Sequence, residues 1–307
     1  MPRRKAGGLE PTLTASSASA NILHMRAIHR IELPTPFAVG PVNTYLIEGS
    51  EPTLIDTGPL TEEAILALER GLGNLGYGFS DIRRIIITHP HVDHSGLVGH
   101  VAVASAGAVL THRLNRAWIE DYEGEWLRRR AFLRDFFESR GVPPEWLDIM
   151  DRGSDFFRKY GAPAPVHGVL KDGDTVRLGD REWQVLLTPG HTAGHICLYQ
   201  PETRALLSGD HLLHEISSNP TLEPPERGSR ERSLSLISYL ASLRRIEALE
   251  IATVFPGHGE PFFDFREVIR NELEHHQMRK EKIAGLLAAG YATVSYTHLR
   301  AHETVLD

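Results

Sequence analysis

Thr88-His-Pro-His-Val-Asp-His-Ser-Gly96 follows the apolar run Ile85-Ile86-Ile87, which predicts a metal site at the end of a buried strand. Four side chains of metal-binding type fall within six positions of this stretch: His89, His91, Asp93 and His94. Side chains two apart in an extended segment share a face, so the first two are predicted to project together. Asp93 and His94 lie past the turn and are predicted to point toward a second, adjacent position. One short loop can therefore serve two adjacent metal ions.

The residue types indicate which metals would bind. Neutral imidazoles combined with a carboxylate suit zinc best, with iron and manganese as alternatives. Open coordination positions nearby are typical of a catalytic site rather than a structural one. The competing interpretation is a loop of solvated surface histidines, and it predicts no matching ligands elsewhere in the chain.

Further candidate ligands occur at three later turns. Each turn contains glycine and follows an apolar run that resembles a strand, and the candidates are His191, Asp210 and His258. Sheet scaffolds present catalytic groups on loops of this kind, directly after a strand ends. The loop of surface histidines is therefore the weaker interpretation.

These motifs resemble those of the metallo-β-lactamase superfamily, and within it the glyoxalase II-like hydrolases. The resemblance covers roughly residues 26–285 and includes all of the family's metal-binding motifs. It implies an α/β fold, the αββα sandwich, in which two mixed β-sheets pack face to face with helices outside.

The resemblance also implies a role for each candidate ligand. His89, His91 and His191 would bind a first metal, Asp93, His94 and His258 a second, and Asp210 would bridge the two. Asp210 stands where one subgroup of zinc β-lactamases carries a cysteine. This departure argues against antibiotic hydrolysis of that type.

Two further residues match positions of the family pattern. Asp56, in Leu54-Ile-Asp-Thr-Gly58, matches an aspartate that orients a metal ligand, although a strand-end aspartate can instead cap the following helix. His195 matches a common Gly-His position after the third ligand. For His195 we expect a structural hydrogen bond rather than a metal contact.

The predicted chemistry is hydrolysis. Two zinc ions, or iron or manganese, can hold a bridging hydroxide at neutral pH, with Asp93 and Asp210 as catalytic carboxylates and Asp210 as the proton acceptor. The expected enzyme is a zinc-dependent hydrolase of small acyl substrates, a thioester, ester or lactone, similar to hydroxyacylglutathione hydrolases or lactonases. One alternative is a phosphodiesterase or ribonuclease of the same fold.

Two non-hydrolytic interpretations also remain. A mono-iron sulfur dioxygenase would need only His89, His191 and Asp210, and a metal-binding regulator would need no turnover. The chain also carries Asp93, His94 and His258, which a one-metal dioxygenase would not need, and this argues against the dioxygenase.

Composition narrows the partners. At 307 residues, with 41% hydrophobic and 24% charged residues, the chain can bury one large core. The net charge of −7 offers no general attraction to nucleic acid, so we expect a small-molecule substrate.

The single cysteine, Cys197, excludes disulfides within the chain and is predicted to be a buried, inert thiol. No run approaches the ~20 apolar residues of a membrane span, and we expect a cytoplasmic protein of undetermined oligomeric state.

Domain organisation follows from where the apolar periodicity begins and ends. We expect a disordered leader over 1–24, with Met25 as the start of the fold, and a metallo-β-lactamase-like domain over 25–262. A helical insert at about 113–165 interrupts the strand rhythm with many aromatic residues. Their helical spacing predicts the packed inner face of two or three helices, and the insert is also a candidate lid over the substrate pocket.

The C-terminal part is predicted to be a helix over 263–293, capped by Asp264 with Glu267, in which His275 and His276 are solvated. This helix resembles the linker to a small winged-helix domain in one branch of the superfamily, and we expect that domain to be truncated in this sequence. Residues 294–304 resemble a translated sequencing-library adaptor, and 294–307 are expected to be a non-native tail. We therefore leave His298 and His302 out of the site.

Overall fold

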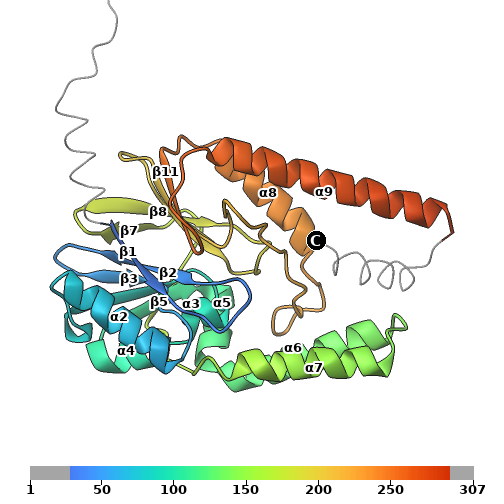
Figure 1. Ribbon diagram of the computed structural model, residues 1–307, viewed down its shortest axis with the longest axis horizontal. Coiled ribbons are helices and arrows are strands. Elements are labelled where there is room, and N and C mark those ends of the chain that lie inside the picture. Colours follow the sequence, from blue (N-terminus) through green and yellow to red (C-terminus); the bar gives the residue numbers. More distant parts are fainter. Residues whose placement is uncertain (1–27, 291–307) are drawn as a thin grey trace, which may run out of the picture.

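Two β-sheets packed face to face, with helices on both outer faces, form the body of the protein (Figure 1). The computed structural model describes residues 28–290, so the predicted leader and tail lie outside the described residues. The αββα architecture expected from the sequence is confirmed. Among the helices of residues 28–290, none combines the length and apolar character needed to cross a bilayer.

The first sheet has the strand order β1-β2-β3-β4-β5-β6. Its strands are β1 (Ile28–Leu33), β2 (Val42–Ile47), β3 (Thr53–Ile55), β4 (Arg84–Ile87), β5 (Ala108–His112) and β6 (Gly168–Leu170). Strands β1 to β3 pair antiparallel, and β3 to β6 pair parallel. The carboxyl ends of β3, β4 and β5 therefore lie along one edge of the sheet.

The second sheet has the order β11-β10-β9-β8-β7. Its strands are β7 (Thr175–Leu178), β8 (Arg181–Leu187), β9 (Ile196–Gln200), β10 (Ala205–Gly209) and β11 (Thr253–Pro256). Only the β10–β11 pair is parallel, and its register shifts between Leu207 and Gly209. Irregularities of this kind re-aim the side chain that follows, which here is Asp210.

Strand β4 shows why the core has separate layers. Ile85 and Ile87 pack with the helices on the outside of the first sheet, whereas Ile86 packs between the sheets. Side chains alternate across a strand, so a strand buried on both faces reads as a continuous apolar run. The apolar run before the histidine motif is therefore the central strand of the first sheet.

The helices cover the two outer faces (Figure 1). The first sheet is covered by α2 (Glu62–Asn74) and α4 (Val98–Ser105), with η1 (Phe79–Asp81) and the short α3 (Val92–Ser95) in the loops. The second sheet is covered by α8 (Ser235–Glu247) and α9 (Phe265–Ala288). Thr61 caps α2 by accepting a hydrogen bond from the backbone N–H of Ala64.

Three helices form the insert: α5 (Arg113–Glu120), α6 (Tyr122–Glu138) and α7 (Pro144–Arg158). Helices α6 and α7 run side by side and project from the body of the molecule (Figure 1). The helical content of the insert agrees with the spacing of its aromatic residues.

The sequence interpretation missed β1 and β6, the two edge strands of the first sheet, and was wrong at two points on α9. Asp264 precedes α9 as predicted, but its side chain forms no capping hydrogen bond and instead lies 3.3 Å from His214 Nε2. His276 is buried rather than solvated, because it lies on the face of α9 that packs against the Tyr239 ring.

Candidate metal centre

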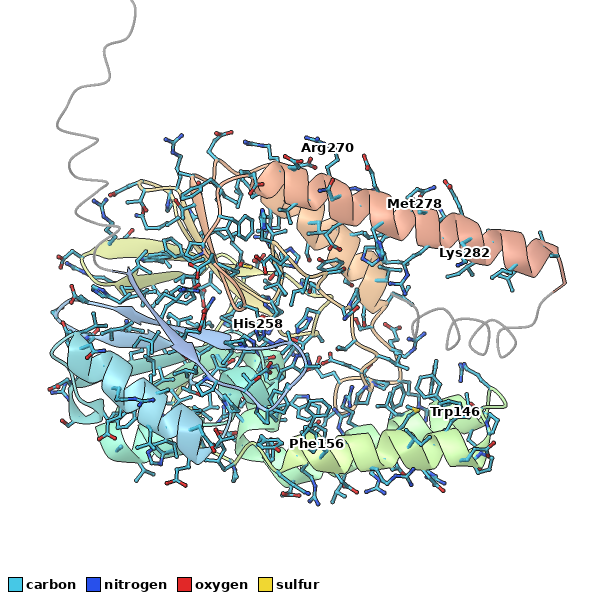
Figure 2. The ribbon with its side chains drawn as sticks, in the orientation of Figure 1. Trp146, Phe156, His258, Arg270, Met278 and Lys282 are labelled. Carbon is cyan, nitrogen blue, oxygen red and sulfur yellow. The ribbon has the colours of Figure 1, made fainter. Side chains whose placement is uncertain are left out.

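The candidate ligands lie where strands of both sheets end, between the two sheets. His89 follows β4, His191 follows β8, Asp210 follows β10 and His258 follows β11. Figure 2 shows His258 in the middle of the molecule, between the sheets. Turns at the carboxyl ends of strands thus bring together residues that are far apart in the chain.

The first group consists of His89, His91 and His191, whose ligand nitrogens all lie within 4.8 Å of one another. His91 is the residue immediately before α3, so its side chain turns back toward the end of β4. Its Nδ1 lies 2.8 Å from Nε2 of His191. Three nitrogens therefore face one point.

The second group consists of Asp93, His94 and His258, whose ligand atoms also lie within 4.8 Å of one another. Asp93 and His94 lie on α3, and Asp93 Oδ2 is 3.5 Å from Nε2 of His258. The short motif thus supplies both groups, as its spacing predicts.

Asp210 lies between the two groups. Its Oδ2 is 3.6 Å from Nε2 of His191 in the first group and 3.6 Å from Nε2 of His258 in the second. Its Oδ1 is 3.2 Å from Nε2 of His94. A Cβ at Gly257 would lie 2.2 Å from that Oδ1, so only glycine leaves room for the carboxylate here.

The other ring nitrogen of four histidines is held by an acceptor. Nδ1 of His94 lies 2.9 Å from Asp56 Oδ2, and Nδ1 of His89 lies 3.0 Å from Thr88 Oγ1, which itself donates to Asp56. Nδ1 of His191 lies 3.1 Å from the carbonyl of Asn219, and Nδ1 of His258 lies 2.6 Å from the carbonyl of Pro41. Because Nδ1 carries the proton in each ring, Nε2 presents a lone pair to the centre.

Four buried atoms at the centre have no hydrogen-bond partner anywhere in residues 28–290: Nε2 of His89, His94 and His258, and Oδ1 of Asp210. Buried polar atoms without partners cost free energy, and such atoms are rare in folded proteins. Cations coordinated by these lone pairs would supply the missing partners. The nitrogen and carboxylate donor set fits zinc, iron or manganese.

Burial keeps the rings of His89 and His91 in the form that binds metal, whereas the carboxylates of Asp210 and Asp93 outweigh burial and raise the pKa of His94 and His258. Burial and the neighbouring His94 hold the pKa of His89 well below its usual range. Burial and His191 lower the pKa of His91 to about 3. Both rings are therefore neutral near pH 7, which is the state in which imidazole binds a metal.

Asp56 supports this arrangement through three hydrogen bonds. Its carboxylate accepts from the Thr88 N–H at 2.8 Å and the Thr88 hydroxyl at 2.7 Å, and it also holds His94. Its φ of 59° lies in the left-handed region, which costs an L-residue free energy and which Asp tolerates better than most. The alternative helix-capping role for Asp56 is wrong, because Thr61 caps α2.

The two remaining predictions near the centre concern His195 and Cys197. His195 Nδ1 lies 2.8 Å from Thr188 Oγ1, and its Nε2 accepts from the N–H of Asp210 at 3.1 Å. Both nitrogens are thus used in structural hydrogen bonds, as expected. Cys197 is buried, and burial raises the pKa of its thiol to about 12, which confirms an inert thiol.

The centre opens into a cavity of about 640 Å³ that reaches the insert. Five of the candidate ligands line one end of it: His91, Asp93, His191, Asp210 and His258. Residues of α5, α6 and α7 line the rest, together with the loop from Phe37 to Val39 and the segment from Asn219 to Glu223. The predicted pocket-lining role of the insert is therefore confirmed.

Arg129 and Glu223 line this cavity and were not found from the sequence. Burial lowers the pKa of Arg129, and burial raises that of Glu223, whose carboxylate accepts from the N–H of Ala193. Within residues 28–290, Arg129 has no hydrogen-bonded partner, unlike its neighbours Arg128 and Arg130. Arg130 also lines the cavity but pairs with Asp151 and Asp155, and three consecutive arginines give no sequence signal for which of them reaches the cavity unpaired.

Comparison with known proteins agrees with this geometry. The sequence model of the metallo-beta-lactamase superfamily matches residues 38–258. The probable metallo-hydrolase YqjP of Bacillus subtilis is 34% identical over 84% of this chain and 79% of its own length. The acyl-coenzyme A thioesterase MBLAC2 of Gallus gallus is 32% identical over 55% of this chain and 56% of its own.

A similar solved structure is the metallo-beta-lactamase family protein TTHA1429 from Thermus thermophilus. It is 32% identical, with a TM-score of 0.72, and the match covers 85% of this chain and 83% of that one.

Proposed function

The chain belongs to the metallo-β-lactamase superfamily, and on that premise we propose that it is a dinuclear metal-dependent hydrolase of acyl thioesters. The observation that carries this proposal is Asp210, which lies between two groups of ligand atoms at the mouth of one cavity. Esters and lactones share the reacting carbonyl and are the nearest other substrates.

The proposed ligand assignment follows the two groups. His89, His91 and His191 would hold one metal, Asp93, His94 and His258 would hold the other, and Asp210 lies where it would contribute to both. Zinc is the first choice, with iron or manganese as alternatives. Bound divalent cations supply a nucleophile at neutral pH and a Lewis acid for the carbonyl.

The protein's own groups would perform the remaining steps. Asp210 accepts the proton released when water attacks the carbonyl carbon. Arg129 shares the cavity wall with His91, close enough for its charge to lower the pKa of that ring. The same charge would stabilise the negative oxygen that develops as the carbonyl is attacked. Asp56 acts only by holding His94 and Thr88 in place.

Two further observations favour a thioester. The named relative MBLAC2 is an acyl-coenzyme A thioesterase. Apolar side chains of the insert, among them Trp126, Leu133 and Met150, form part of the cavity wall, which suits an acyl group.

The test is metal analysis of the purified protein followed by a panel of thioesters, lactones and phosphodiesters. We expect two metal ions per chain and turnover of thioesters, lost after chelation and restored by zinc. Turnover of phosphodiesters alone would instead support the nuclease alternative. A single iron with oxygen consumption would support the dioxygenase.

A further inference from the structure

The cavity has two parts. The candidate ligands and Arg129 line one part, and the part between α6 and α7 is lined by apolar side chains together with Arg130, Arg134 and Asp151. Figure 2 shows Phe156 at the end of α7 nearest the sheets and Trp146 at its far end, so the hairpin leads away from the centre. A ligand whose reacting carbonyl lies at the centre must therefore extend along the hairpin.

Each helix of the hairpin presents apolar side chains to the cavity beside the charged ones. Trp126 and Leu133 lie seven residues apart on α6, and Leu147, Met150 and Phe157 follow the same helical spacing on α7. Met150 is 37% exposed and Phe157 41% exposed although both line the cavity. An apolar ligand would cover this surface.

The charged side chains along the hairpin already have partners. Asp151 pairs with Arg130 Nε at 3.1 Å and with Arg134 Nη1 at 2.7 Å, joining α7 to α6. These groups line the cavity but require no opposite charge from a ligand. The ligand portion between the helices is therefore uncharged.

Gly153 leaves unfilled space at this place. It lies within α7 and lines the cavity, and a Cβ added there would meet no atom within 4 Å. Glycine inside a helix is less favourable than alanine. Neither the helix nor the packing needs glycine here, and the missing side chain leaves this volume open to the cavity.

We propose that the space between α6 and α7 binds the acyl chain of the substrate, and that the volume at Gly153 sets the longest chain accepted. This inference rests on the proposed function, because it assumes that an acyl carbonyl reacts at the metal centre. The ligand class is a straight, uncharged hydrocarbon chain. Chains that outgrow the cavity gain nothing from added length.

The test is calorimetric titration of the zinc-loaded protein with straight-chain carboxylates from butanoate to dodecanoate, the products of the proposed reaction. For the unaltered protein, Kd should fall about fourfold per added methylene, because each buried methylene contributes about 0.8 kcal/mol, until the cavity is full. Gly153→Leu should weaken dodecanoate binding at least about tenfold and leave butanoate within about twofold.

Three variants serve as controls. Gly153→Ala gains helix propensity as Gly153→Leu does, but it adds little volume. The chain length at which Kd stops falling should therefore shorten by one methylene at most. Gly285→Leu places the same side chain at an open, exposed glycine of α9, remote from the cavity, and should change nothing. Ser154→Leu adds volume at the next lining position and replaces Gly153→Leu if that variant does not fold.

The outcomes separate the two proposals. Kd that is independent of chain length, or equal losses for butanoate and dodecanoate in Gly153→Leu, would overturn the chain-binding site. Length-dependent binding without hydrolysis of any thioester would leave the chain site standing and refute the proposed function. Thioester turnover without length dependence would refute the chain site alone.

Discussion

At the scale of the residue, the centre depends on protons placed by neighbours of the candidate ligands. The Asp56 carboxylate and the carbonyls of Asn219 and Pro41 accept hydrogen bonds from the Nδ1–H groups of His94, His191 and His258. The Nε2 atoms of these rings therefore point toward Asp210. Removing a group that orients a ligand and removing a proposed ligand should therefore have different consequences.

Asp210→Ala is expected to lower turnover more than about 100-fold, because loss of a group that only orients a ligand already costs roughly 10–100-fold. It removes the carboxylate shared by both positions, so both metals should be lost together. Asp93→Ala and His258→Ala should empty mainly one position. Metal content per chain and kcat of the three variants check this, and an Asp210→Ala protein that retains two metals with normal turnover contradicts it.

Asp56→Asn is expected to weaken metal binding by about 10–100-fold without unfolding the protein. Asparagine tolerates the left-handed backbone at this position, but its amide cannot accept from the Thr88 N–H, the Thr88 hydroxyl and His94 together. Competition titration with a zinc chelator measures the change. Unaltered zinc affinity would show that His94 does not depend on Asp56.

At the scale of the element, one buried carboxylate ties α6 to the segment that closes the cavity. The Glu125 side chain is 1% exposed and pairs with Arg128 and Arg227. Arg128 also donates to the carbonyl of Pro225 at 2.8 Å. These contacts hold the segment after Asn219 against the insert.

The double variant Arg128→Met/Arg227→Met should lower the free energy of unfolding by about 2–3 kcal/mol, because it leaves the buried carboxylate without a cation. Glu125→Gln should cost less than about 1 kcal/mol, since both arginines are partly exposed and regain water. Urea unfolding of the two proteins gives the comparison. A larger loss for Glu125→Gln would show that the ion pairs themselves, rather than burial of the charge, stabilise this junction.

At the scale of the whole molecule, the proposed metals join the two sheets. One sheet contributes the motif after β4, and the other contributes the residues after β8, β10 and β11. A metal that binds only the folded chain stabilises it by mass action. Metal removal should therefore lower the stability of the entire fold.

Chelation is expected to lower Tm by about 5–10 °C relative to protein held at 100 times the zinc Kd, where binding contributes about 2.7 kcal/mol. Calorimetry with and without zinc measures the shift. Asp210→Ala serves as the matched control, because its Tm should hardly respond to zinc.

Cys197 offers an independent readout of the same effect. It is the sole cysteine, and its buried thiol, with a pKa of about 12, should react with a thiol reagent only when the fold opens. Chelation should speed labelling and zinc should slow it. Rapid labelling that ignores zinc would mean that the centre does not stabilise the second sheet.

The sequence alone determined a central strand of the first sheet and the set of candidate ligands, and the resemblance of its motifs to a known family implied the αββα fold. The strand and the ligands are local signals: an apolar run buried on both faces, and metal-binding side chains placed directly after strands. It did not predict the edge strands β1 and β6, because β1 mixes buried with partly exposed residues and β6 has only 3 residues. The sequence interpretation also wrongly placed His276 in solvent, because this residue packs against Tyr239, which is distant in the sequence.

Only the tertiary structure decided which atoms face one another. It placed Asp210 between the two groups, assigned the Nδ1 protons through Asp56, Asn219 and Pro41, and brought Arg129 and Arg130, but not Arg128, to the cavity wall. These features depend on distances between segments up to 217 residues apart, as between Pro41 and His258. Residue type and spacing can indicate a metal, but the shape of the cavity beside it depends on how distant elements pack.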